Sequence, residues 1–177
     1  DHRDLHSFPT RRSSDLGPRG VWWSEGFFRP LTSLFMGLNL GAWGREPAGH
    51  HLASVALHAG TAWLVCLLAR RLGAGRGAAL LAGALFLLHP SRSEPVAWIS
   101  GQGDLLAALF SIAALLAFLA GPSRLAAGLA AALLAAALLA KESALGVPLA
   151  AFALYRYRGR ARSEERRVGK ECRSRWS

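Results

Sequence analysis

The sequence predicts an all-α fold: a polytopic membrane helix bundle with about five spans and one amphipathic helix in the membrane interface. Hydrophobic residues make up 52% of the 177 residues, and charged residues only 18%. The hydrophobic residues gather in runs that short polar breaks separate, and long apolar runs in a chain of this size are typical of membrane spans. Most charged residues lie in the breaks, where a membrane protein tolerates them.

The two ends of the chain interrupt this pattern. Residues Arg162–Arg167 read RSEERR, and one DNA sequence that encodes them has a reverse complement that encodes RRSSDL, which is Arg11–Leu16. The match extends outward on both sides, and the DNA resembles a short-read sequencing adapter. A basic tail with a coincidental complement is the alternative. We expect residues 1–16 and 162–177 to be artefacts, and residues 17–161 to be a fragment of a longer membrane protein.

Setting these ends aside changes the composition. The remaining 145 residues carry 12 basic and 5 acidic side chains, so the net charge falls from +10 to +7. Cys66 is then the only cysteine, which excludes an intrachain disulfide framework. The remaining charges are spread among loops and form no basic stripe with stacking aromatic residues. We therefore expect no nucleic-acid partner.

The first predicted element is the interfacial helix. Pro30 suits the first turn of a helix, and about 14 residues follow before Gly44–Gly49 ends the pattern. This stretch is too short and too polar to span, so it predicts an amphipathic helix. Its apolar face is expected to contain Leu31, Leu34, Phe35, Leu38 and Ala42.

Five apolar runs follow as predicted spans. They are Leu52–Ala69, Gly77–Leu88, Leu105–Ala120, Leu125–Ala140 and Ala144–Tyr155. The second run would reach only roughly 18 Å of a roughly 30 Å hydrocarbon core, so it must extend into Gly73–Arg76 or lie inside the bundle. The fourth is almost entirely Ala and Leu, and small residues at four-residue spacing let helices approach closely. GC-rich codons are the alternative reason for its alanines.

Charge predicts the orientation of these spans. Alternating breaks would place seven basic and no acidic residues on the cytoplasmic face: Arg70, Arg71, Arg76, Arg124, Arg156, Arg158 and Arg160. The other face would receive all five acidic residues: Glu25, Glu46, Glu94, Asp104 and Glu142. Five basic residues also fall on that outer face, so the acidic residues mark the two sides more sharply than the basic ones do.

The outer face carries the candidate chemistry. The polar stretch His89–Leu106 lies between two spans, and membrane proteins retain charge mainly where it works or forms pairs. An ordinary solvated loop is the alternative, and it is the favoured one for a generic loop. The outer residues have no recognised metal-ligand spacing, and no nucleophile elbow or phosphate-binding glycine loop is present. We predict no metal site and no cofactor, while a divalent metal stays open.

One ionisable residue falls inside a predicted span. Helical spacing places His58 on the same face as Ser54 and Thr61. An ionisable group at this depth is a candidate functional residue. The alternative, which the sequence favours, is a neutral histidine that donates one hydrogen bond between packed helices.

Four segments carry a resemblance to a known family. In chain order they read FRPLTSLFMGLNLGAWG, HHLASVALH, FLLHPSRSEPVAWISGQGDLLA and AKESALGVPL. Together they resemble the multi-pass protein O-mannosyltransferase-like glycosyltransferases of the C-type (GT-C) fold, closest to the membrane domain of the group with tetratricopeptide repeats. The resemblance covers about Phe28–Tyr155. This chain departs from the pattern at Arg92, where a second histidine is usual, and at Gln102, where a basic residue is usual.

The resemblance implies transfer of a mannose-like sugar from a polyprenyl-phosphate carrier to a protein or glycan acceptor. The site would face the extracytoplasmic side of a membrane, which we expect to be a bacterial inner membrane. Such folds place their catalytic aspartate after a first span that would lie upstream of Leu16, so no residue here is assigned that role. The candidates for donor or substrate binding are His89, Arg92, Glu94, Asp104, Lys141 and Glu142.

Two alternatives accompany this interpretation. Lys141 and Glu142 can simply cap two helices at the interface, with Lys141 extending toward water; the resemblance favours a functional role. The whole bundle can also be a non-catalytic membrane anchor or part of a transporter. Transporters place polar groups at the midplane of repeated units. Here the polar residues gather at one face and no repeat is evident, which disfavours transport.

Overall fold

The computed structural model describes residues 28–157, and every regular element in that range is helical. The six labelled α-helices are α1 Pro30–Trp43, α2 Pro47–Arg71, α3 Arg76–Leu88, α4 Ser93–Ala97, α5 Gln102–Phe118 and α6 Arg124–Ala140. Three 3₁₀ turns are η2 Pro90–Arg92, η3 Ile99–Gly101 and η4 Glu142–Gly146. A last helix runs over 147–157. The all-α prediction is confirmed, and the predicted adapter-derived ends lie outside the described residues.

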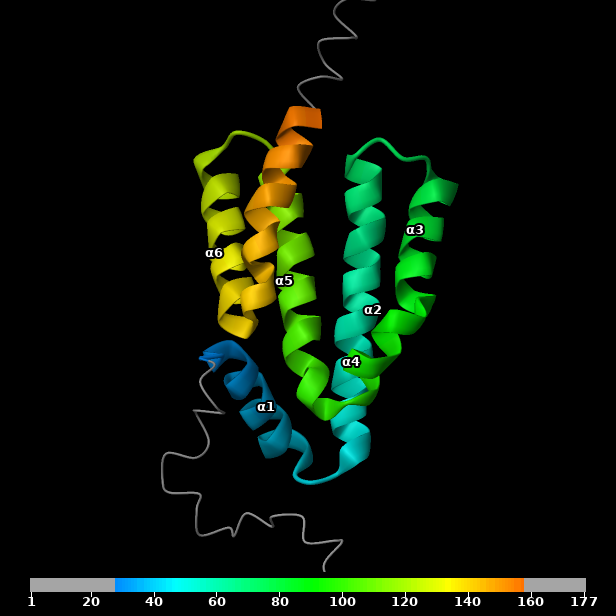
Figure 1. Ribbon diagram of the computed structural model, residues 1–177, viewed down its shortest axis with the longest axis vertical. Helices are drawn as coiled ribbons and strands as arrows, with labels where there is room; N and C mark the ends of the chain where they lie inside the picture. The colour runs from blue at the N-terminus through cyan, green and yellow to red at the C-terminus, as the bar shows by residue number, and fades with distance from the viewer. Residues whose placement is uncertain (1–27, 158–177) are drawn as a thin grey trace, which may run out of the picture.

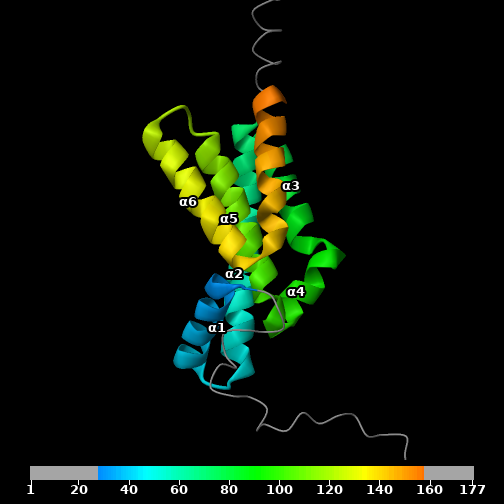
Figure 2. The same cartoon turned by 60° about the vertical axis from the view of Figure 1, so that its left-hand side comes forward.

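The long helices stand side by side along one axis. In Figure 1, α2, α3, α5, α6 and helix 147–157 follow the long direction of the molecule, and α1 lies beneath one end of α6 and α5. Figure 2 shows α1 again at this end, together with α4. Two of the helical segments are long and apolar enough to cross a membrane, Pro47–Arg71 and Ile99–Phe118. Arg76–Leu88 and Arg124–Ala140 are apolar but shorter.

The two ends of the bundle differ in charge. We call the end with α1, α4 and η4 the acidic end, because the chain order and Figure 1 place all four described acidic residues there: Glu46, Glu94, Asp104 and Glu142. We call the opposite end, with the turns 72–75 and 119–123, the basic end. Its helix termini carry Arg70, Arg71, Arg76, Arg124 and Arg156. The structure thus separates these residues as predicted, whereas Glu25, Arg158 and Arg160 lie outside the described residues.

The interior contains several buried polar side chains beside its apolar core, and much of the exterior is apolar. The largest fully buried side chains are Gln102, Thr61 and Ser54. Outward-facing leucines are more than half exposed, among them Leu80, Leu81, Leu85, Leu125 and Leu129. A soluble domain rarely exposes so many large apolar side chains together, whereas hydrocarbon around the bundle would cover such a surface.

Helix α5 is the centre of the bundle and packs against both α2 and α6. Its buried residues include Leu105, Leu106, Ala107, Ala114 and Leu115. The facing residues of α6 are small, with Ala126, Ala137 and Ala140 all buried. This agrees with the prediction that alanines in this run allow a close approach of helices.

Helix α3 differs from the prediction. It begins at Arg76 and has 13 residues, so it does not extend through Gly73–Gly75. Gly73 has a φ of +97°, which only glycine adopts readily, and the chain turns there. The helix ends at Leu88 because Pro90 disfavours a helical conformation at His89, whose ψ is 126°. It also lies at the edge of the bundle rather than inside it (Figure 1).

Helix α1 forms where it was predicted, but its faces are different. Leu31 and Phe35 pack against the buried cluster of Leu106, Ala107 and Ala140, as an apolar face should. Leu34 and Leu38 of the same predicted face are 52% and 64% exposed. The polar residues Thr32 and Asn39 are buried instead. Periodicity alone missed this because Thr32 has a specific partner in the bundle, described below.

Candidate functional site

The first part of the site is an ion pair between Asp104 and Lys141. Asp104 lies in the first turn of α5, and Lys141 directly follows the last residue of α6. The ammonium nitrogen Nζ of Lys141 donates to both carboxylate oxygens of Asp104, at 2.6 and 2.7 Å. The pair therefore ties the start of α5 to the end of α6 at the acidic end.

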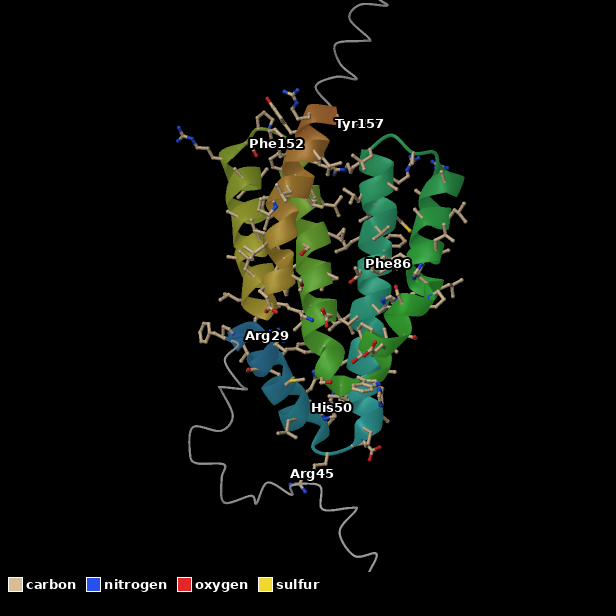
Figure 3. All side chains as sticks on the ribbon, in the orientation of Figure 1. Arg29, Arg45, His50, Phe86, Phe152 and Tyr157 are labelled. Atoms are coloured by element: carbon tan, nitrogen blue, oxygen red, sulfur yellow. The ribbon has the colours of Figure 1, made fainter. Side chains whose placement is uncertain are left out.

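The second part is an ion pair between Arg29 and Glu142. The guanidinium of Arg29 donates from Nη2 to Oε1 of Glu142 at 2.6 Å and from Nε to Oε2 at 3.1 Å. This two-point contact is the geometry in which Arg binds carboxylates and phosphates most strongly. Figure 3 shows Arg29 at the start of α1, beneath the end of α6. We call Arg29, Asp104, Lys141 and Glu142 the charge cluster.

A buried contact lies beside the charge cluster and supports it. The hydroxyl of Thr32 donates to the carbonyl oxygen of Ala140 at 2.8 Å, which satisfies one of the orphan carbonyls at the end of α6. A side chain at Gly103 would approach Oγ1 of Thr32 to 3.1 Å, so the absence of one lets α1 approach α5. Helices α1, α5 and α6 thus meet at the charge cluster.

Glu142 has a perturbed acidity. The hydrogen bond from Arg29 lowers the pKa of Glu142 most, and a backbone hydrogen bond within Glu142 lowers it further. Desolvation raises the pKa of Glu142 in opposition, and the charges of Arg29 and Lys141 lower it further. The carboxyl is therefore ionised at neutral pH, and both cations lie near enough to act on it.

The structure brings together three of the six predicted residues, Asp104, Lys141 and Glu142. His89, by contrast, makes a local contact, in which its Nδ1 bonds Oγ of Ser91 at 2.8 Å. Glu94 lies in the first turn of α4 and is exposed. The backbone of Arg92 ends η2. These three residues share a segment that packs against α2, α3 and α5.

His58 makes a hydrogen bond between two packed helices. It is 7% exposed, and its Nε2 lies 3.1 Å from the carbonyl oxygen of Leu87. A carbonyl only accepts, so Nε2 carries the proton and the ring is bound as a donor. Its ring also contacts Phe86, which Figure 3 shows between α2 and α3. Ser54 and Thr61 are buried on the same face of α2, as predicted.

The sequence did not identify two residues that make contacts between helices at the acidic end, Arg29 and Gln102. Arg29 was not a candidate, because 113 residues separate it from Glu142 and it precedes every predicted element. Gln102 was noted only as a departure from the family pattern. Its side chain is fully buried, and its Nε2 donates to the carbonyl oxygen of His50 at 3.1 Å and to Oγ of Ser54 at 3.3 Å. It therefore fastens the start of α5 to α2.

The acidic residues at this end could in principle hold a metal ion, so their grouping matters. Within residues 28–157, no group of three or more His, Cys, Asp or Glu side chains is placed to hold a metal ion. The two described ion pairs instead use the carboxylates of Asp104 and Glu142 to bind cationic side chains.

A helical bundle with an apolar exterior, some buried polar side chains and its charges at the two ends belongs to the class of membrane-embedded helical domains. Comparison with curated proteins shows which membrane proteins the chain is similar to. The chain is 41% identical over 104 residues to protein O-mannosyl-transferase Tmtc1 of Drosophila melanogaster, which is 59% of this chain and 11% of that protein. It is 35% identical over 92 residues to human TMTC2, covering 52% and 11%. It is 30% identical over 125 residues to mouse TMTC3, covering 67% and 13%.

These similarities confirm the resemblance to protein O-mannosyltransferases, and the chain is similar to one segment of them. It spans between 11% and 13% of the length of these three relatives. No family model matches the chain, and no solved structure matches it.

Proposed function

We propose that this chain is part of an integral-membrane glycosyltransferase. The enzyme would move a mannose-like sugar from a polyprenyl-phosphate carrier to a protein or glycan acceptor. The single observation that supports this most is the 41% identity to a protein O-mannosyl-transferase. The charge cluster adds a chemical reason, because positioned cations stabilise a phosphate leaving group as charge develops on it.

The proposed topology has five spans: α2, α3, α5, α6 and helix 147–157. Helix α3, with 13 residues, is short for a span. A short apolar helix is accommodated by local thinning of the bilayer and by polar residues at its ends. The acidic end would face the extracytoplasmic side, which leaves the arginines of the basic end in the cytoplasm. The relatives named above are animal proteins, and location in a bacterial inner membrane stays a prediction from the sequence.

Within this proposal, Lys141 lies at the end of α6, where a lipid phosphate would reach the bundle. Asp104 orients its ammonium group through two hydrogen bonds. Glu94 is exposed, so it is accessible to the sugar or the acceptor. His89 and Arg92 belong to the same segment and complete the proposed substrate contacts. Residues 1–16 and 162–177 remain, in our proposal, adapter-derived.

Sugar transfer can be tested in a chimera. Residues 28–157 would replace the matching segment of Drosophila Tmtc1, and transfer of mannose from its polyprenyl-phosphate carrier to a protein acceptor would be measured. We expect Lys141→Ala and Glu94→Gln to lose transfer while expression and membrane insertion persist. Arg76→Ala, at the basic end, is the matched control and should retain activity. If both site variants transfer sugar within a few-fold of the parent chimera, the proposed donor site is wrong.

A further inference from the structure

The charge cluster is electrically balanced. Its two cations, Arg29 and Lys141, each bind one carboxylate through two contacts of 2.6 to 3.1 Å. A balanced cluster does not attract an anion by its net charge. An anion can bind these cations only if it takes the place of a carboxylate.

The exposure of the four side chains favours such a replacement. The side chains of Arg29 and Lys141 are 31% and 25% exposed, whereas those of Glu142 and Asp104 are 50% and 42% exposed. In each pair the carboxylate is thus the more accessible partner. Exposed ion pairs contribute little net stability, so exchanging one partner for a stronger anion costs little.

The pair at Arg29 is the one suited to exchange. Glu142 is next to Lys141 in the chain, and the charges of both Arg29 and Lys141 act on its carboxylate. A group that replaced this carboxylate on Arg29 would therefore lie beside the chain neighbour of Lys141. The Nε and Nη2 donors of Arg29 already bind two oxygens, which is the geometry that Arg offers to a phosphate.

Breaking this pair would leave the helices attached. Thr32 still holds the carbonyl of Ala140, and Lys141 still has Asp104 as a partner. Leu31 and Phe35 stay packed on the buried cluster. The side chain of Glu142 can therefore turn away without the release of α1.

We propose that Arg29 and Lys141 form a phosphate site that fills by exchange: a phosphate group displaces the carboxylate of Glu142 from Arg29 and binds between the two cations. The inference rests on the proposed function only for the expected source of the phosphate, a polyprenyl carrier. Inorganic phosphate has the same chemistry. Arg29, rather than Arg92, is then the second cation of the site.

The test uses the full 177-residue chain in maltoside micelles, which contain no phosphate. Binding of polyprenyl phosphate, inorganic phosphate and the phosphate-free polyprenol is measured for each variant. Glu142→Gln removes the competing carboxylate, so phosphate should bind about three- to fivefold more tightly, as expected from the strength of exposed ion pairs. Arg29→Gln should weaken binding by about tenfold or more, because it removes charge-assisted hydrogen bonds.

The controls make the same charge changes elsewhere at the acidic end. Glu46→Gln and Arg45→Gln should change binding by less than about twofold, since exposed charges are screened over a short distance. Figure 3 shows Arg45 beyond the far end of α1, away from Arg29. Misfolding cannot produce the tighter binding expected for Glu142→Gln. Equal effects of Glu142→Gln and Glu46→Gln would overturn the exchange, and so would equal binding of polyprenol.

The two arms also distinguish the source of the phosphate. Tighter binding of polyprenyl phosphate alone supports a lipid carrier as the ligand, and tighter binding of both phosphates supports a site for the headgroup itself. Failure of sugar transfer in the chimera, with the binding pattern intact, would reject the proposed function and keep the exchange. Transfer without the effect of Glu142→Gln would reject the exchange alone.

Discussion

At the scale of single residues, the acidic end joins positions that are distant in the sequence. Asp104 and Lys141 are 37 residues apart, and Arg29 and Glu142 are 113 apart. The sequence identified Asp104, Lys141 and Glu142 as candidates for donor or substrate binding. Which cation binds which carboxylate could not be predicted, because pairing depends on how α1, α5 and α6 meet. Arg29 carried no signal of its own, since a single arginine before a helix is common.

The lowered pKa of Glu142 predicts how the second ion pair responds to pH. A carboxyl whose folded pKa is lowered stabilises the fold above its ordinary pKa of 4.5 and loses this contribution as the pH falls through the lowered value. We expect NMR of the labelled side-chain carboxyl to give a midpoint below 4.5, and Arg29→Gln to raise it. Arg45→Gln serves as the control. A midpoint unchanged by Arg29→Gln would show that Arg29 does not bind Glu142.

The hydrogen bonds of Gln102 lead to a prediction about stability, because its side chain is fully buried. Its amide group donates to two oxygens, the carbonyl of His50 and Oγ of Ser54. Gln102→Glu keeps the shape but places a carboxylate against these acceptors. It should destabilise the bundle by about 3 kcal/mol or more, whereas Gln102→Leu should cost only about 1–2 kcal/mol. Unfolding in mixed micelles measures both, and equal losses would contradict the hydrogen bonds described.

At the scale of elements, the sequence predicts where helices lie in the chain better than which of their side chains are buried. The break that begins at Gly44 ends α1 as expected, since glycine acts through the local backbone, whereas the turn at Gly73 stops α3 from extending as predicted. The environment of helix α1, by contrast, did not follow from its sequence, because polar residues of α1 are buried. Its buried Thr32 is explained by the carbonyl of Ala140, which only the assembled bundle brings near.

The close contact between α2 and α3 predicts how substitutions of glycine in α3 change stability. A methyl group at Gly83 would collide with Sγ of Cys66 and lie 3.0 Å from the backbone oxygen of Ala62. Gly83→Ala should therefore push α3 away and cost about 1–3 kcal/mol. Gly77→Ala, in the same helix with open space around it, should instead stabilise by roughly 0.5–1 kcal/mol. Unfolding in micelles compares the two; a stabilising Gly83→Ala would mean that the helices lie farther apart.

At the scale of the whole molecule, the apolar exterior follows from the length and apolar composition of the runs. The sequence predicted all five long helices and the separation of charge between the two ends. It did not predict that α3 would stop at 13 residues at the edge of the bundle. Length and apolar composition together identify Pro47–Arg71 and Ile99–Phe118 as candidate spans, and the other three predicted spans are shorter helices.

The most direct test of a membrane-spanning bundle with its charge cluster outside is cysteine labelling. In a background with Cys66→Ala and Cys172→Ser, single cysteines replace Ser91, at the acidic end, and Ser123, at the basic end. A reagent that does not cross membranes is added to intact cells. We predict that Ser91→Cys is labelled, and that Ser123→Cys is labelled only after the cells are opened. Labelling of Ser123→Cys alone in intact cells would invert the orientation, and labelling of both would contradict a bundle that spans the membrane.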